Sequence, residues 1–322
     1  MNEKQKLLAV IGPTAVGKTN LSIQLAKKYN GEIISGDSMQ IYKTMDIGTA
    51  KISPAEMEGI PHYLIDIKEP DEAFSAAEFQ QLVRRQIEDI SSRGKLPIIV
   101  GGTGLYIQSV IYDYQFSDAP SDEEFRKKLE KRAEIEGSEV LFAELEKMDP
   151  TSAENIHPNN VRRVIRALEV YHCTGIPVSQ WQEKQQPELL YNTSIIGLTM
   201  DRDLLYQRIN ERVDLMMRAG LLKEVESLYE KGIRNCPSIQ AIGYKEIYDY
   251  IEGRATLETA IENLKQNSRR YAKRQLTWFR NKMDVEWFDM TKALEEEQRQ
   301  KKFAEICFHI EGKLRVKSNT YY

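Results

Sequence analysis

The segment 12–19 reads GPTAVGKT and constrains the fold more than any other feature of the chain. It matches G-x-x-x-x-G-K-[ST] and follows an apolar run, LLAVI at 7–11. The glycines let the backbone turn so that N–H groups meet an anion at the positive end of the next helix. The lysine ammonium then reaches terminal phosphate oxygens, and the threonine hydroxyl reaches Mg²⁺ or the phosphate. The pattern therefore predicts a diphosphate-binding loop made of Gly12, Pro13, Thr14, Ala15, Val16, Gly17, Lys18 and Thr19.

Apolar runs alternate with helical patterns along much of the chain. The runs stand at 7–11, 32–35, 62–67, 97–102 and 194–200. Such alternation is typical of a parallel sheet with helices on both faces. We therefore predict an α/β core of the P-loop NTPase-like kind, formed by 1–115 and 193–290. Charged amphipathic patterns indicate a helical insertion at 116–192, and a polar, peripheral C-terminal tail is expected at 291–322.

Charge and hydropathy exclude several classes of protein. The chain has 322 residues and a net charge of -4, with no apolar run near the ~20 residues that a membrane span needs. Its first residues do not resemble a secretory signal. The three cysteines show neither CxxC spacing nor a metal pattern with the four histidines. We expect a cytoplasmic protein that has no membrane partner and acts as a monomer.

Two further loops follow predicted strands. The run EIIS ends at Ser35, which places Asp37 at the carboxyl edge of the sheet, where α/β proteins bind ligands. There Asp37 can hold Mg²⁺, act as a general base, or be a structural residue only. The second loop, GGTGLY at 101–106, presents the hydroxyl of Thr103. Together with the phosphate loop, these features describe a group-transfer site.

The usual signature of nucleotide hydrolysis is missing. P-loop NTPases commonly hold Mg²⁺ with an aspartate that ends a core strand. Here the run PIIV continues into Gly101 and Gly102. Asp66, after HYLI, is the only substitute, and it is equally well interpreted as a turn residue. The loop therefore predicts diphosphate binding, and hydrolysis does not follow from it.

Basic side chains cluster on two predicted helices. The stretch 269–282 contains six basic residues and no acidic ones, and a second cluster lies at 162–166. In the first helix Tyr271, Ala272, Leu276 and Phe279 fall opposite the cations, on a face that packs. A cationic face is either solvated or binds a polyanion such as RNA. Because the chain as a whole is acidic, a purely basic helix is not expected as a merely solvated face, and this favours polyanion binding.

In combination, these motifs resemble those of the tRNA dimethylallyltransferase family, also called tRNA isopentenyltransferases. The bacterial members attach an isopentenyl group to the adenosine immediately 3′ of the anticodon. The resemblance spans nearly the whole chain. It rests on GPTAVGKT, GDSMQIYKTMDIGTAK at 36–51, PHYLID at 61–66, FSAAEF at 74–79, VGGTGLYI at 100–107, RRVIRALEV at 162–170, RVDLMMRAGLLKEV at 212–225, AIGYKE at 241–246 and YAKRQLTWFR at 271–280.

The resemblance implies roles for individual residues. The loop would grip the diphosphate of dimethylallyl diphosphate rather than ATP, with Lys18 and Thr19 holding it. Mg²⁺ is the expected cofactor, and the loop motif makes Thr19 its candidate ligand. Asp37 would accept the proton of the exocyclic adenine amine, Thr103 would assist, and Arg212 would neutralise the leaving group. The insertion would grip the anticodon stem-loop of tRNA. The implied tRNA-binding residues are Asp37, Ser38, Met39, Gln40, Thr103, Arg126, Arg162, Arg163, Arg166, Gln240, Gly243, Tyr244, Lys245 and Arg274.

Two other functions fit parts of the pattern. A P-loop kinase that phosphorylates a small metabolite would use the same loop, with Asp37 as base or metal ligand. An RNA-binding protein without catalysis would use a nucleotide as a switch. The missing strand-end aspartate and the basic helices count against the kinase.

Overall fold

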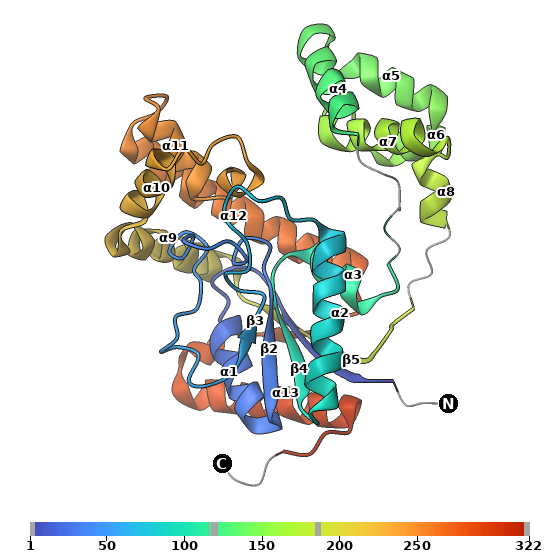
Figure 1. The fold of residues 1–322 in the computed structure, drawn as a ribbon. Coiled ribbons are helices and arrows are strands. Elements are labelled where there is room, and N and C mark those ends of the chain that lie inside the picture. The colour runs from blue at the N-terminus through green and yellow to red at the C-terminus, as the bar shows by residue number, and fades with distance from the viewer. Residues whose placement is uncertain (1–3, 115, 117–121, 184–187, 319–322) are drawn as a thin grey trace. The chain divides into compact units, whose positions relative to one another are not determined.

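The computed structural model describes residues 4–114, 116, 122–183 and 188–318 (Figure 1). The chain divides into two compact units. One comprises Met1–Tyr112 and Leu189–Tyr322, and the other comprises Asp113–Glu188. None of the described helices combines the length and apolar character that crossing a bilayer requires.

The first unit is built on a six-stranded sheet in which every pair of neighbours is parallel, in the order β3-β2-β4-β1-β5-β6. Its strands are β1 (Lys6–Ile11), β2 (Gly31–Gly36), β3 (His62–Tyr63), β4 (Leu96–Gly101), β5 (Asn192–Thr199) and β6 (Glu286–Asp289). The predicted α/β class is confirmed. Because β1, β2 and β4 are neighbours, the loops that follow them lie together at the carboxyl edge.

Helices cover both faces of this sheet, as Figure 1 shows. The helices of this unit are α1 (Lys18–Tyr29), α2 (Ala76–Ser92), α3 (Gly104–Ile111), α9 (Arg202–Ala219), α10 (Leu221–Glu230), α11 (Tyr244–Ile251), α12 (Leu257–Lys282) and α13 (Glu296–Leu314), with short 3-10 turns η1 (Pro237–Gln240) and η2 (Lys292–Leu294). Of these, α10 and α11 pack in a separate buried cluster that contains no residue of the described strands. Residues of β1 alternate between the two faces. Leu8 and Val10 pack with α1 and α13, whereas Leu7, Ala9 and Ile11 pack with α2 and α3.

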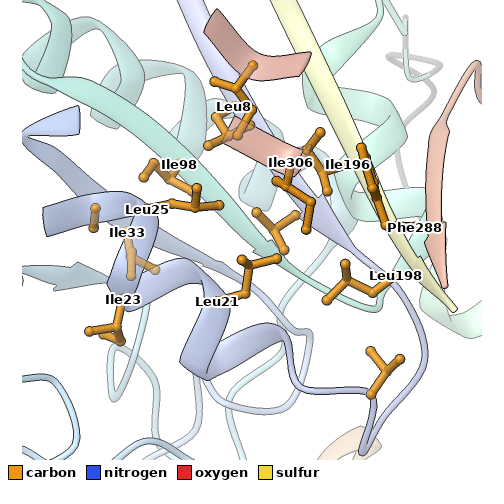
Figure 2. Packing of buried hydrophobic residues seen from close by; sticks show 14 of the residues in the cluster. Leu8, Leu21, Ile23, Leu25, Ile33, Ile98, Ile196, Leu198, Phe288 and Ile306 are labelled. Carbon is orange, nitrogen blue, oxygen red and sulfur yellow. The ribbon is translucent and has the colours of Figure 1, made fainter. Parts of the chain in front are cut away.

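The C-terminal helix α13 packs on the same face of the sheet as α1. Figure 2 shows Ile306 of α13 beside Leu8 and Ile196, and Ile310 and Leu314 belong to the same buried cluster. The expected polar, peripheral tail at 291–322 is therefore wrong for the helix. Its charged residues face solvent, while apolar residues spaced three or four apart form a stripe that closes the core.

Two strands differ from the sequence prediction. The run at 62–67 forms only a two-residue strand, because Leu64 and Asp66 have left-handed backbones, with φ of 61° and 56°, that end the pairing. The strand β6 was not predicted. It is short, and it extends the sheet by pairing Trp287 and Phe288 with β5.

The long helix α12 contributes to both faces of the sheet. Ala272 packs in the α1 cluster, and Phe279, two turns later, packs in the α2 cluster. Between them Gln275 is buried and donates to a loop that follows β4. The helix therefore passes the carboxyl edge of the strands, where the candidate site lies.

The second unit has a core of its own. It consists of α4 (Glu123–Glu136), α5 (Ser138–Met148), α6 (Pro150–Asn155), α7 (Val161–Thr174) and α8 (Val178–Glu183). Leu129, Leu141 and Leu168 are among its buried residues. Its boundaries differ from the expected 116–192, because residues 189–192 return to the sheet: Tyr191 packs in the α2 cluster and Asn192 begins β5.

One buried carboxylate ties β2 to the end of α2. Glu32 is 1% exposed, and it accepts two hydrogen bonds from Arg93, at 2.7 and 2.6 Å, one from Lys95 at 2.6 Å and one from Tyr63 at 2.8 Å. The Arg93 bonds lower the pKa of Glu32 to about 2, against the effect of burial, and Lys95 and Tyr63 add to them. This network fixes the amino end of the strand that carries Asp37.

We expect Glu32→Gln to destabilise the protein at neutral pH. A carboxyl whose pKa falls from 4.5 to about 2 on folding stabilises the native state above pH 4.5, and this stabilisation is lost as pH falls towards 2. It amounts to roughly 3 kcal/mol at most. Urea unfolding of the variant should show a lower free energy at pH 7 and a weaker acid dependence. Glu88→Gln, an exposed carboxylate on α2, is the control. Equal acid dependence in both variants contradicts this account.

Candidate active site

The phosphate loop has the backbone that its glycines predict. Gly12 has a φ of 148° and Gly17, which caps α1, has a φ of 102°. A Cβ at Gly12 would lie 2.7 Å from the Leu198 carbonyl oxygen, so only glycine fits there. Ala15 also has a positive φ, of 66°. The loop therefore turns tightly from β1 into the positive N-terminus of α1, a geometry suited to an anion.

Lys18 lies folded over this loop. Its ammonium donates to the carbonyl oxygens of Gly12 at 2.9 Å and Pro13 at 2.7 Å. Burial lowers the pKa of Lys18 to about 7; the charge of Arg212 adds to the effect, and the charge of Asp37 opposes it. A bound anion would favour the charged form, so the loop carries a cation whose charge depends on occupancy and pH.

Asp37 lies just beyond β2, facing the same cations. Its Oδ1 accepts a hydrogen bond of 2.8 Å from the backbone N–H of Met39. Burial raises the pKa of Asp37, and the N–H groups of Met39 and Gln40 and the charges of Lys18 and Arg212 oppose this rise. A half-buried carboxylate with a raised pKa is suited to take up a proton.

Two arginines of α9 reach the loop. Arg208 donates to the carbonyl oxygen of Ala15 at 2.9 Å. One turn later, Arg212 is close enough to Asp37 for each charge to shift the pKa of the other group. Burial lowers the pKa of Arg212, which stays charged because its ordinary value is so high. Arg208 was not predicted, although its i, i+4 spacing from Arg212 indicates a shared face.

Thr103 joins the two other loops. Its N–H donates to the Gly36 carbonyl at 3.3 Å, and its hydroxyl accepts from the Ser38 N–H at 3.1 Å and lies 3.4 Å from the Ser38 hydroxyl. A Cβ at Gly101 would meet the Gly36 carbonyl oxygen at 2.3 Å. The glycines of β2 and β4 thus allow the close approach that brings Thr103 beside Ser38.

Gln275 of α12 links the phosphate loop to the Thr103 loop. Its Oε1 accepts from the Thr14 N–H at 3.1 Å, and its Nε2 donates to the Gly102 carbonyl at 3.0 Å. A Cβ at Gly102 would lie 2.0 Å from Nε2. Gln275 was not predicted. Its position within a basic stretch gives no local signal of a buried bridge.

Tyr271, one turn before Gln275, also lies at the site rather than on a purely packing face. Burial, together with the charge of Asp37, raises the pKa of its hydroxyl to about 12. Hydrogen bonding to Thr103 and Gln275 opposes that rise. Exposed Arg274 lies over the Tyr271 ring, 5.6 Å from its centroid. The helix therefore carries both a site hydroxyl and an exposed cation.

The amide of Gln40 is held from both ends. The Ser35 hydroxyl donates to Oε1 at 2.9 Å, while Nε2 donates to the carbonyls of Thr49 at 3.2 Å and Ala50 at 3.4 Å. Met39 packs partly against the helical cluster formed by α10 and α11. The segment after β2 therefore places Asp37, Ser38 and Gln40 in succession at the carboxyl edge.

Three of the expected RNA-binding residues lie between the end of η1 and the first turn of α11. Gln240 is exposed at the end of η1. The buried N–H of Gly243 donates to Glu246 at 2.7 Å, and the Lys245 ammonium lies 3.6 Å from the same carboxyl group. Gln240 and Lys245 present polar groups to solvent, whereas Gly243 contributes backbone shape.

Tyr244 requires a correction. Its side chain is 0% exposed and packs in the α10 and α11 cluster. Its hydroxyl donates to Glu224 at 2.7 Å. A side chain enclosed in this way does not contact RNA directly, so its expected role as a contact residue is wrong for this arrangement. It acts within the protein.

The arginines of the second unit differ from one another. Arg126 and Arg166 both bind the fully buried Glu169, at 3.1 and 2.7 Å. Arg162 and Arg163 are exposed at the first turn of α7. The first two therefore have a structural role whatever else they bind, while the other two direct their charge outward.

Asp66 does not stand in for the missing strand-end aspartate. It binds the buried ammonium of Lys51 at 2.6 Å and follows β3 in a left-handed turn. Of its two interpretations, the structure favours the turn residue. Thr19 is exposed in the first turn of α1.

Comparison with known sequences gives consistent matches. The model of the IPP transferase family matches residues 40–282. The tRNA dimethylallyltransferase of Geobacillus thermodenitrificans is 65% identical over 315 residues, which cover 98% of this chain and 99% of that protein. The one from Bacillus cereus (strain B4264) is 65% identical over 317 residues, covering 98% of each.

Solved structures agree with these sequences. The full-length tRNA isopentenylpyrophosphate transferase from Bacillus halodurans is similar, with a TM-score of 0.72 and 54% identity over 97% of this chain and 99% of that chain. A eukaryotic dimethylallyltransferase, captured in crystallographic snapshots acting on tRNA, has a TM-score of 0.79 and 35% identity, over 92% and 77%. With a family match over most of its length and relatives this similar, the chain belongs to the IPP transferase family.

Proposed function

We propose that the protein transfers the dimethylallyl group of dimethylallyl diphosphate to the N6 amine of the adenosine immediately 3′ of the anticodon in tRNA. One observation carries the proposal. A half-buried carboxylate, Asp37, is coupled to the phosphate-loop cation Lys18 and to Arg212. A base and an anion site are thus side by side, as alkyl transfer from a diphosphate to an amine requires.

The reaction divides between these groups. The N6 lone pair attacks C1 of the dimethylallyl group as the C1–O bond breaks, and the electrons of that bond leave with the diphosphate. The proton released from N6 passes to the Asp37 carboxylate. Lys18, Arg212 and the loop N–H groups stabilise the charge that develops on the leaving oxygen. The adenine must leave its stack to reach Asp37.

A Mg²⁺ ion fits this site only with help from the substrate. The described residues contain no group of three acidic, histidine or cysteine side chains able to hold a metal. The Thr19 hydroxyl together with diphosphate oxygens and water is a donor set that Mg²⁺ accepts. When bound, the ion would neutralise diphosphate charge.

Recognition of tRNA is assigned to two surfaces. On the first unit, Ser38, Met39, Gln40, Thr103, Gln240, Gly243, Lys245 and Arg274 would serve the reacting base and its neighbours. On the second unit, Arg162 and Arg163 would contact phosphates of the anticodon stem-loop, with Arg126 and Arg166 beside them. We expect the enzyme to act as a monomer in the cytoplasm, where its substrate is found.

The kinase alternative has lost its basis. The relatives are tRNA-modifying transferases by name, and nothing in the family match points to phosphorylation. Asp66, the candidate for the strand-end aspartate that would hold Mg²⁺ in a kinase, is bound to Lys51.

Asp37→Asn should abolish transfer while leaving tRNA binding largely intact. Asparagine keeps the oxygen that accepts the Met39 N–H but cannot take up the N6 proton, so we expect a loss of about 10²–10⁴-fold in single-turnover rate. Filter binding with unmodified tRNA checks affinity. Asp71→Asn, at an exposed aspartate, is the control. Undiminished turnover in Asp37→Asn would mean that another group, or none, acts as base.

Donor affinity should depend on pH through Lys18. The pKa of Lys18 is about 7 in the free protein, so its ammonium is increasingly lost as pH rises above 7. Since the diphosphate binds the charged form, calorimetric affinity for dimethylallyl diphosphate should fall between pH 7 and 9, by up to about tenfold per unit. Lys18→Arg, whose side chain stays charged, should remove the dependence. Constant wild-type affinity over this range contradicts the assignment.

Arg162→Ala should weaken tRNA binding and its salt dependence. If Arg162 contacts one phosphate, the slope of log affinity against log salt should become shallower by about one unit. Arg162→Lys retains the charge and serves as the control, with a slope close to that of the wild type. The same slope in Arg162→Ala and Arg162→Lys removes this arginine from the interface.

A further inference from the structure

The segment between β2 and β3 is held by a carboxylate from a distant helix. Glu224 lies on α10, and its Oε2 accepts from the backbone N–H groups of Asp46 at 2.9 Å and Ile47 at 2.8 Å. Its Oε1 accepts from the N–H of Gly48 at 3.1 Å. Three consecutive N–H groups thus converge on one side chain, and together with it they form what we call the 46–48 cradle.

Tyr244 completes this cradle. Its hydroxyl donates to Oε1 of Glu224 at 2.7 Å, and burial raises the pKa of Tyr244, which keeps the proton on the hydroxyl. Its ring also contacts the segment closely: a Cβ at Gly48 would lie 2.5 Å from the ring. With four donors, the carboxylate is satisfied, and the ring leaves the segment little room to shift.

The cradle ends where the contacts of Gln40 begin. The next two residues, Thr49 and Ala50, direct their carbonyl oxygens at Nε2 of Gln40, at 3.2 and 3.4 Å. Carbonyl oxygens only accept hydrogen bonds, so the amide must turn its N–H₂ group toward them. The Ser35 hydroxyl then donates to Oε1 at 2.9 Å. The orientation of the Gln40 amide is therefore fixed by the position of residues 49 and 50.

A glutamine amide of fixed orientation can distinguish bases. With its N–H₂ group directed at the Thr49 and Ala50 carbonyls, Oε1 keeps one lone pair beyond its bond from Ser35 and can accept from the N6 amine of adenine, whereas a reversed amide would present a donor there. The described hydrogen bonds of Glu224 go to the N–H groups of residues 46–48 and to the Tyr244 hydroxyl, and none of them goes to the phosphate loop. The cradle should therefore influence the RNA base and leave the diphosphate donor unaffected.

We propose that Glu224 is a positioning residue for adenine recognition: it holds the 46–48 cradle so that the Thr49 and Ala50 carbonyls fix the Gln40 amide. This inference rests on the proposed function and on the role proposed there for Gln40. It also assigns Tyr244 a place in substrate recognition, through Glu224 rather than through contact with RNA.

The test compares KM values for an anticodon stem-loop and for dimethylallyl diphosphate. In Glu224→Gln the amide retains one acceptor oxygen, and its N–H₂ group faces N–H donors. We expect KM for the stem-loop to rise roughly fivefold or more, with KM for the donor changed less than about twofold. Tyr244→Phe, which removes a single donor, should have a smaller effect in the same direction. Glu230→Ala, an exposed carboxylate on α10, is the control.

A double-mutant cycle with Gln40→Ala separates positioning from general loosening. If Glu224 acts through Gln40, the double variant should be no worse than the more damaged single variant. Effects that multiply, or a donor KM that rises in parallel with that of the stem-loop, overturn the proposal. A wild-type KM in Gln40→Ala also overturns it, while prenyl transfer by the wild type keeps the proposed function intact.

Discussion

The site depends on one electrostatic arrangement, a half-buried carboxylate that shares its surroundings with two cations. Burial raises the pKa of Asp37 and lowers the pKa of Lys18, and their mutual attraction offsets both shifts in part. Arg212 adds positive charge that favours an ionised Asp37 and repels the Lys18 ammonium. An incoming diphosphate would relieve that repulsion between cations. In the reaction proposed above, donor binding and the basicity of Asp37 would therefore be linked, because the same charges would govern both.

The parallel sheet makes this arrangement possible. Its order places β2, β4 and β1 next to each other. The three loops that follow these strands, which carry an anion-binding backbone, a carboxylate and a hydroxyl, therefore begin at the same edge of the sheet. Two side chains from outside the sheet then fix the loops: Gln275 bridges the phosphate loop and the Gly102 carbonyl, and Glu224 holds the segment after Gln40. Rigid positioning of this kind is what brings reacting groups together before the chemical step.

Features encoded over a few neighbouring residues could be predicted from the sequence. The phosphate loop, the runs that form β1, β2, β4 and β5, and the position of Asp37 after β2 all follow from local pattern. Gln275, Tyr271 and Glu224 could not be found in this way, because each acts through partners far away in the chain. The burial of α13 was discernible from its apolar spacing, but its many charges suggested a polar tail. Tyr244 was misassigned because a family motif does not say which way a side chain points.

The most direct test of the account is to identify the group that the protein transfers from the donor bound at the phosphate loop. Purified protein would be incubated with unmodified tRNA and either labelled dimethylallyl diphosphate or ATP labelled at its γ-phosphate, followed by nucleoside analysis of the tRNA. We predict N6-dimethylallyladenosine next to the anticodon with the first donor and no transferred label with the second. Phosphoryl transfer from ATP without any prenylated nucleoside would contradict the account.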